Sequence, residues 1–164
     1  MADAVPPGGL GGFRRFLLEW SDLPLRAALA ATFITHGWPK INGGIAGFSK
    51  GLFELGVPAA TVTAWAVAMA EFVGGIMMAL GFCTRAIALS HMAIMMFAIS
   101  RVHYNQGFMM HSGTGKNAAG WEWQFALLCI ATAMFIRGAG PLSLDYFLKS
   151  YWASKRAANP PKPA

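Results

Sequence analysis

The sequence has 164 residues, of which 55% are hydrophobic and only 12% are charged, whereas soluble domains carry about 25% charged residues. This composition indicates a membrane protein, and the length suits one compact bundle rather than two domains. The formal net charge is +6, but the basic residues lie between apolar segments and in the tail instead of forming one stripe, which argues against nucleic acid as a partner and indicates contact with anionic lipid.

The first twenty residues are not expected to cross a membrane. Residues 1–12 are rich in proline and glycine, which predicts a flexible tail without a cleavable signal peptide. Residues 13–20 mix arginine with aromatic and apolar residues, which predicts a short amphipathic helix at the cytoplasmic face of a membrane. Ser21 or Asp22 is expected to cap the helix that follows.

Four apolar stretches are predicted to cross the membrane as helices, at about residues 23–41, 59–82, 85–102 and 120–137. The second is long enough to cross a bilayer, whereas the others have uncharged cores shorter than the roughly 20 residues that a perpendicular helix needs. Arginine and tryptophan at the helix ends extend these spans, and Arg26 is expected to reach back to the lipid headgroups. A globular protein with buried helices is the alternative.

Short amphipathic segments are predicted beside the spans. Residues 45–56 have an apolar face and a polar face, which predicts a helix lying at the outer interface. Thr84 is expected to cap the third span, and residues 142–152 predict an interfacial helix capped by Ser143. The rest of the basic, proline-containing tail is expected to be disordered.

The basic residues predict the orientation. In the four-span arrangement, four of them lie on the outer side: Lys40, Lys50, Arg101 and Lys116. The other nine lie on the side that holds both termini: Arg14, Arg15, Arg26, Arg85, Arg137, Lys149, Lys155, Arg156 and Lys162. Because cytoplasmic loops carry the excess of lysine and arginine, both termini are predicted to be cytoplasmic.

Glu71 lies near the middle of the second span, where a carboxylate costs about 2.5–3.5 kcal/mol on insertion scales. Ala66, Ala70 and Gly74 recur every four residues, a pattern that lets another helix approach closely, and Gly75 leaves space one turn beyond the acid. Glu71 is therefore expected to face the bundle. It is either a functional acid, which binds a ligand group, relays a proton or pairs with a base, or a hydrogen-bonded strut.

Further polar residues are expected above Glu71 in the outer half of the bundle. His36, Arg101, His103 and Glu122 lie near the outer ends of their spans, as do the interfacial anchors Trp38 and Lys40. An outward-opening pocket with Glu71 as its floor, lined with tryptophan and methionine, would suit a quinone head. The alternative is a belt of interfacial residues that reach the headgroups.

No metal site is predicted. His103 and His111 lie in or beside a glycine-rich loop, and their spacing matches no standard site. Cys83 and Cys129 are isolated and belong to no CxxC motif.

Several motifs in this chain resemble the DoxX family: His36-Gly37-Trp38-Pro39-Lys40, Ala70-Glu71-Phe72-Val73-Gly74-Gly75, Leu80-Gly81-Phe82-Cys83-Thr84-Arg85 and Gly140-Pro141-Leu142-Ser143-Leu144-Asp145. The resemblance covers about residues 23–146 and implies an all-α bundle of four transmembrane helices in a bacterial-type inner membrane, with short interfacial helices. Residues 1–20 would be a cytoplasmic tail and interfacial segment, 21–146 the membrane domain and 147–164 a basic cytoplasmic tail. The residues at the family's pattern positions are His36, Lys40, Glu71, Gly74, Gly75, Thr84 and Arg85.

The family's name comes from a subunit of an archaeal thiosulfate:quinone oxidoreductase, and other members are linked to membrane responses to oxidative stress, in complexes with partner enzymes. The resemblance therefore implies a membrane subunit of a redox-linked complex that handles a quinone or a similar amphipathic molecule. This chain has no cysteine array or cofactor motif for sulfur oxidation, so it is not expected to catalyse alone.

The expected roles follow from these two lines of reasoning. Glu71 is the candidate catalytic acid, and no cofactor is expected to be covalently bound. The candidate ligand-binding residues are His36, Trp38, Lys40, Glu71, Arg101, His103 and Glu122, and the candidate structural residues are Gly74, Gly75, Thr84 and Arg85. The expected partners are the lipid bilayer and proteins of a membrane complex. A non-enzymatic scaffold and a small-molecule carrier are the alternative functions.

Overall fold

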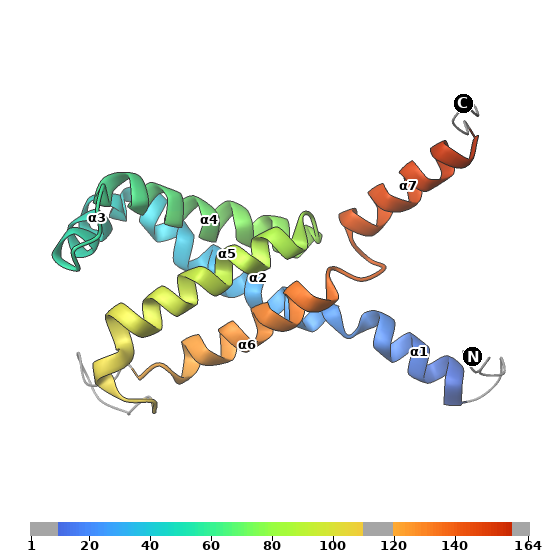
Figure 1. The fold of residues 1–164 in the computed structure, drawn as a ribbon, viewed down its shortest axis with the longest axis horizontal. Coiled ribbons are helices and arrows are strands. Elements are labelled where there is room, and N and C mark those ends of the chain that lie inside the picture. Colours follow the sequence, from blue (N-terminus) through green and yellow to red (C-terminus); the bar gives the residue numbers. More distant parts are fainter. Residues whose placement is uncertain (1–9, 110–119, 159–164) are drawn as a thin grey trace, which may run out of the picture.

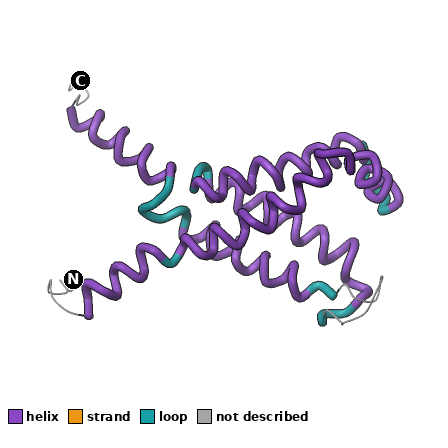
Figure 2. The backbone as a smooth tube through the Cα atoms, turned by 180° about the vertical axis from the view of Figure 1, so that it is seen from behind, coloured by secondary structure: helices purple, strands orange, loops and turns teal. Residues whose placement is uncertain are grey.

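The described part of the chain is helical. A computed structural model describes residues 10–109 and 120–158, and these residues form helices joined by short turns (Figure 1, Figure 2). The helices are α1 (Leu10–Trp20), α2 (Asp22–Pro39), α3 (Ile45–Glu54), α4 (Ala60–Leu80), α5 (Thr84–Phe97), α6 (Glu122–Arg137) and α7 (Leu144–Ala158), with helical turns at Lys40–Gly44, Ala98–His103 and Tyr104–Gln106. The all-α prediction is confirmed.

Two helical stretches of the described chain are long and apolar enough to cross a membrane. They are α4, with 21 residues, and Thr84–Gln106, with 23 residues, which joins α5 to the two helical turns after it. Helices α2 and α6, with 18 and 16 residues, do not meet the same measure of length and hydropathy. Helix length and hydropathy therefore do not establish the predicted four-span arrangement.

The central helices pack as two pairs that cross. The most extensive contacts are those of α2 with α4 and of α5 with α6 (Figure 1). Glycines allow α2 and α4 to approach closely, because a Cβ on Gly37 would lie 2.5 Å from the backbone nitrogen of Phe72, and one on Gly75 would lie 2.8 Å from Ile34. Where the pairs cross they bury a common core: Leu29, Ala30, Phe33, Met78, Ala88, Met95, Leu127, Ala131 and Met134.

Helix α3 is the amphipathic helix that the sequence predicts over residues 45–56, and its apolar face meets protein. It folds back on the first half of α4, where Leu52 packs against Ala60 and Ala64. The predicted small-residue face of α4 is accordingly wrong in its first member, because Ala66 is exposed while Ala60, Ala64 and Ala68 are buried. The first half of α4 turns its small residues toward α3, a contact that the spacing of residues within α4 does not reveal.

The end of the bundle that carries both termini, here called the terminal end, is held together by Arg26. The predicted reach of this side chain to the headgroups is wrong, since Arg26 is only 3% exposed. Its guanidinium donates hydrogen bonds to the carbonyl oxygens of Met78, Ala79, Ala139 and Leu142, at 2.5–3.2 Å. Unpaired carbonyls at the C-terminus of α4 attract a cation, which offsets the cost of burial.

Asp22 stands beside Arg26 and does not act as a cap. Its Oδ2 lies 3.7 Å from Nη1 of Arg26, and the residue is buried. Ser21 makes no side-chain cap either, because its hydroxyl donates to the carbonyl oxygen of Leu18 at 2.9 Å. Neither of the two residues predicted to cap α2 does so. Ser21 binds the end of α1, and Asp22 lies against Arg26.

Asp145 connects α7 to the turn between α4 and α5. Its carboxylate accepts hydrogen bonds from the backbone nitrogens of Cys83 at 2.8 Å and Thr84 at 2.9 Å. The predicted cap of α5 by Thr84 is thus replaced by a carboxylate that lies 61 residues further along the chain. Ser143 does cap α7 as predicted, since its hydroxyl accepts from the backbone nitrogen of Tyr146 at 3.1 Å.

Helices α1 and α7 leave the terminal end separately and project from the bundle (Figure 1, Figure 2). Helix α7 continues to Ala158, so the disorder predicted for the tail is wrong for residues 153–158. That segment contains alanine, lysine and arginine, which are good helix formers. The proline residues of the tail come only after Ala158.

Candidate functional site

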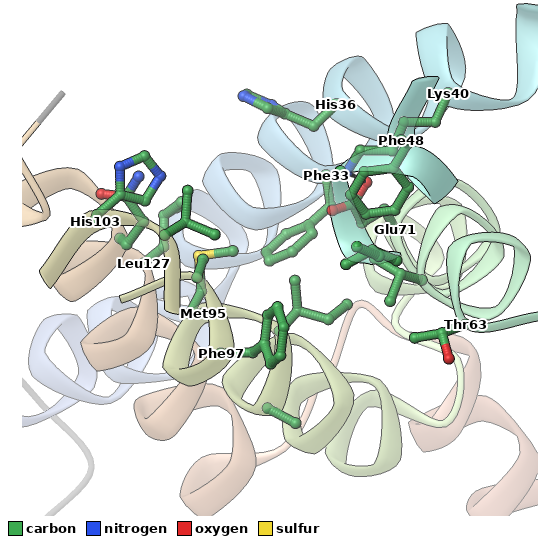
Figure 3. Close-up of a pocket in the computed structure, with 18 of the residues that line it drawn as sticks. Phe33, His36, Lys40, Phe48, Thr63, Glu71, Met95, Phe97, His103 and Leu127 are labelled. Atoms are coloured by element: carbon green, nitrogen blue, oxygen red, sulfur yellow. Dashed lines mark hydrogen bonds and ion pairs between the residues drawn. The ribbon is translucent and has the colours of Figure 1, made fainter. Parts of the chain in front are cut away.

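A cavity of about 610 Å³ lies at the opposite end of the bundle, here called the cavity end, where the two helix pairs diverge and α3 packs on α4. Its volume falls in the range of about 300–1,000 Å³ that small-molecule sites occupy. Phe33, Met95 and Leu127 belong to the common core and also line the cavity, so the cavity begins where the core ends (Figure 3). The fold thus places the cavity directly beside the common core, with these three side chains as the boundary.

An ion pair stands on one wall of this cavity. Nζ of Lys40 binds Oε2 of Glu71, and it lies 4.5 Å from the centroid of the Phe48 ring (Figure 3). The Glu71 side chain is 5% exposed and that of Lys40 is 23% exposed. As the sequence predicts, Glu71 faces the bundle, and Lys40 compensates the charge whose burial would otherwise be costly.

Lys40 continues α2 just beyond the point where Gly37 packs against Phe72, which places its side chain beside Glu71. Asn42 and Gly43 leave the helical conformation, and Gly43 adopts a φ of 100°, which favours glycine. The chain therefore reverses direction just beyond Lys40, and α3 returns across α4 with Phe48 facing the ammonium group. The predicted interfacial anchor Lys40 is thus the partner of the buried acid Glu71.

Two histidines line the same cavity. Nδ1 of His36 donates to the carbonyl oxygen of Thr32 at 2.8 Å, which fixes this tautomer in the neutral ring and leaves Nε2 as an acceptor. His103 lies on the opposite side of the cavity from Lys40, and its Nδ1 is 3.4 Å from Oε1 of Gln106 (Figure 3). The structure therefore places His36, Lys40, Glu71 and His103 around one cavity, with a direct contact only between Lys40 and Glu71.

The other candidate ligand-binding residues do not line the cavity. The indole of Trp38 is exposed and packs against Phe72, with ring centroids 5.3 Å apart. Arg101 is exposed on the helical turn after α5, and Glu122 begins α6, where its neighbours Trp123 and Gln124 take the lining positions. Position near a helix end did not distinguish the inward-facing residues from the outward-facing ones.

The candidate structural residues lie away from the cavity. A Cβ on Gly74 would lie 3.3 Å from Nε2 of His91, a buried ring that stacks on Phe33 with centroids 3.6 Å apart. Gly75 allows the close approach of α2, and the backbone nitrogen of Thr84 donates to the Asp145 carboxylate. Nη2 of Arg85 donates to the carbonyl oxygen of Ile136 at 3.1 Å, which joins α5 to the end of α6.

Sequence reasoning missed the contribution of α3 and Gln124. Gly47, Phe48, Gly51 and Leu52 supply one wall of the cavity. The apolar face of residues 45–56 was a usable signal, but it did not tell whether the face meets lipid or protein. Gln124 lines the cavity with a buried Oε1 that has no hydrogen-bond partner among the described residues.

The described residues contain no group of three or more histidine, cysteine or acidic side chains that would hold a metal ion. His103 and Gln106 approach each other at the cavity end, whereas His111 lies outside the described residues. The cavity is therefore a site of hydrogen-bonding and charged groups on a largely apolar surface.

These features define the class as an all-α protein with membrane-length apolar helices and a cavity that contains a buried ion pair. A family model for DoxX matches residues 21–104, just over half of the chain and including α2 to α5. The chain belongs to the DoxX family of membrane proteins. No curated protein and no solved structure matched it.

Proposed function

We propose that α2, α4, α5 and α6 cross a bacterial-type inner membrane, with both termini in the cytoplasm. Several observations support this. Both termini lie at one end of the bundle (Figure 1), eight of the eleven basic residues that the structure describes fall on that side, and α4 and the stretch through α5 are long enough to span. Helices α2 and α6 each pack along one of these spans as its antiparallel partner.

In this membrane the cavity holds an amphipathic small molecule of the quinone type, and the chain serves as a subunit of a redox-linked complex. The observation that carries the proposal is the Lys40–Glu71 ion pair on the wall of an otherwise apolar cavity. A buried ion pair adds little stability compared with apolar residues of the same size. Its position beside an open volume is better explained by recognition of a polar ligand head.

The groups on the cavity wall suit the chemistry of a quinone carbonyl. The Lys40 ammonium has three protons, and Glu71 accepts one of them, so the remaining protons are available to a carbonyl oxygen. Glu71 keeps the ammonium at the cavity, and His36 offers Nε2 at the rim for a ligand hydroxyl. Electrons for reduction of the ligand come from a partner protein, consistent with a subunit role.

The test is quinone binding by the Glu71→Gln protein reconstituted in lipid nanodiscs. Without the carboxylate, Lys40 has no buried anionic partner and turns toward the surface. We expect the Kd for a benzoquinone that bears a decyl tail to rise about tenfold, which corresponds to about 1.4 kcal/mol. Tryptophan fluorescence quenching or equilibrium dialysis of the nanodiscs would measure it.

Glu122→Gln is the matched control, because it makes the same change in an acid outside the cavity. Its affinity should equal that of the wild type. Equal affinity in the wild-type and Glu71→Gln proteins, with both correctly inserted, would show that Glu71 is a structural strut and would refute the proposal.

A further inference from the structure

The side of the cavity between α4 and α5 differs from the rest. The two helices are in contact in their halves nearer the terminal end. There Nε2 of His91 lies 3.3 Å from the carbonyl oxygen of Ala70, and Gly74 faces Ile87. Toward α3 they diverge (Figure 1), and the cavity lies between them. The residues that flank this gap are Thr63 and Val67 on α4 and Ala93, Phe97 and Ala98 on α5 and the turn that follows it.

The chemistry of the cavity changes from one side to the other. Lys40 and His36 lie on the α2 side, whereas Thr63 and Phe97 lie on the opposite side (Figure 3). The flanking residues of the gap include no charged side chain, and Thr63 directs its hydroxyl to the carbonyl oxygen of Pro58 at 3.2 Å. The site therefore has a polar wall for a head group and an apolar exit.

The surroundings of this exit are also apolar. The two helices that flank it are those of the described chain that are long and apolar enough to cross a membrane. Ala93 is exposed although it lines the cavity, so it stands at the boundary between the cavity and the outside of the bundle. Its neighbours on the outer surface, Leu89 and Met96, are 52% and 58% exposed and face the region that lipid chains would fill.

We infer that the ligand is a lipid whose ring-shaped polar head binds near Lys40 and whose single long hydrocarbon tail leaves the cavity between α4 and α5 into the bilayer. This inference rests on the proposed function and specifies its ligand. A cavity of about 610 Å³ accommodates a molecule of drug size, so a ring whose tail is as long as a lipid chain must extend out of it. The gap is the route that requires no burial of a tail against charged groups.

The experiment compares two probes, an unsubstituted benzoquinone and the same ring with a decyl tail, in nanodiscs that contain the full-length protein. Ala93→Trp places a large side chain at the exit. We expect it to raise the Kd of the decyl probe at least tenfold and to leave the Kd of the tail-less ring within twofold. Each Kd is compared with that of the wild type for the same probe, so the different partitioning of the probes into lipid cancels.

Leu89→Trp is the matched control, because Leu89 lies one turn before Ala93, is exposed and does not line the cavity. It should change neither affinity. Equal effects of Ala93→Trp on both probes, or no effect on either, would overturn the tail route while leaving the proposed function intact. Failure of the wild type to bind either probe would instead refute the proposed function, and the inference with it.

Discussion

The two ends of the bundle use charged residues in opposite ways. At the terminal end, Arg26 and Asp145 are bound to backbone groups of distant segments. At the cavity end, Lys40 and Glu71 are bound to each other beside an open volume. Charges at the terminal end replace missing backbone hydrogen bonds, whereas those at the cavity end leave protons and lone pairs for which no hydrogen bond to another described residue is seen.

This difference explains why the helix pairs can diverge at one end only. The carbonyl oxygens at the end of α4 and in the loop before α7 converge on one guanidinium. Asp145 then fixes the start of α5 against the same loop. A rigid terminal end allows the opposite ends of the helices to separate around a ligand without loss of their crossing geometry. Changes at the terminal end should therefore alter stability, and changes at the cavity end should alter binding.

Removal of Arg26 is expected to have the largest effect. Arg26→Leu leaves four backbone carbonyls without their donor and the buried Asp22 without its cationic neighbour. We expect a loss of about 3–5 kcal/mol in unfolding free energy, the range found when one partner of a buried ion pair is removed. Denaturant titration in mixed micelles would measure the loss.

Arg85→Leu is the comparison for Arg26, since the Arg85 side chain is exposed and donates one hydrogen bond, to Ile136. Its expected cost is under about 1 kcal/mol. A similar loss in both variants would show that Arg26 does not hold the terminal end together.

The sequence predicts the secondary structure of this protein well, because long apolar stretches bounded by glycine, proline and charged residues leave few alternatives. It also predicts that Glu71 faces inward. The partners of charged residues were not predictable in the same way. An arginine in the first turn of an apolar helix can either contact the headgroups or be buried. Arg26 is buried because the carbonyl oxygens of Ala139 and Leu142 lie within reach of its guanidinium, and the local sequence does not reveal this.

The same limit applies to the cavity. Lys40 reaches Glu71 because α2 packs closely on α4 at Gly37, and the chain then reverses at Asn42 and Gly43 so that α3 covers α4. Local sequence indicates the turn and the amphipathic helix but does not determine which surface the helix covers. The sequence predicts Arg101 and Glu122 in the outer half above Glu71 from their positions near helix ends, but the side of a helix on which a residue lies depends on packing between helices.

Substitution of Asp145 is expected to have an intermediate effect. Asp145→Asn removes one of the two acceptor oxygens at the start of α5 and the negative charge that favours a helix N-terminus. We expect a loss of about 0.5–2 kcal/mol, the usual value of such a cap. Faster hydrogen exchange at the amides of Cys83 and Thr84 would locate the effect at the terminal end, and Glu19→Gln, in an exposed acid of α1, should leave these amides unchanged.

The smallest expected effect is at Gly51. It tests whether a glycine that lowers the stability of α3 leaves space that the ligand uses. Gly51 lies within α3 and lines the cavity, and a Cβ there would meet nothing within 4 Å. Gly51→Ala should raise the unfolding free energy by about 0.5–1 kcal/mol, because alanine has the higher helix propensity. Gly12→Ala in α1, where the space is equally open, should give a similar gain.

The two positions should differ with a larger side chain. Gly51→Leu fills part of the cavity and should weaken quinone binding, whereas Gly12→Leu should not. Equal binding in both leucine variants would show that the space beside α3 is not used by the ligand.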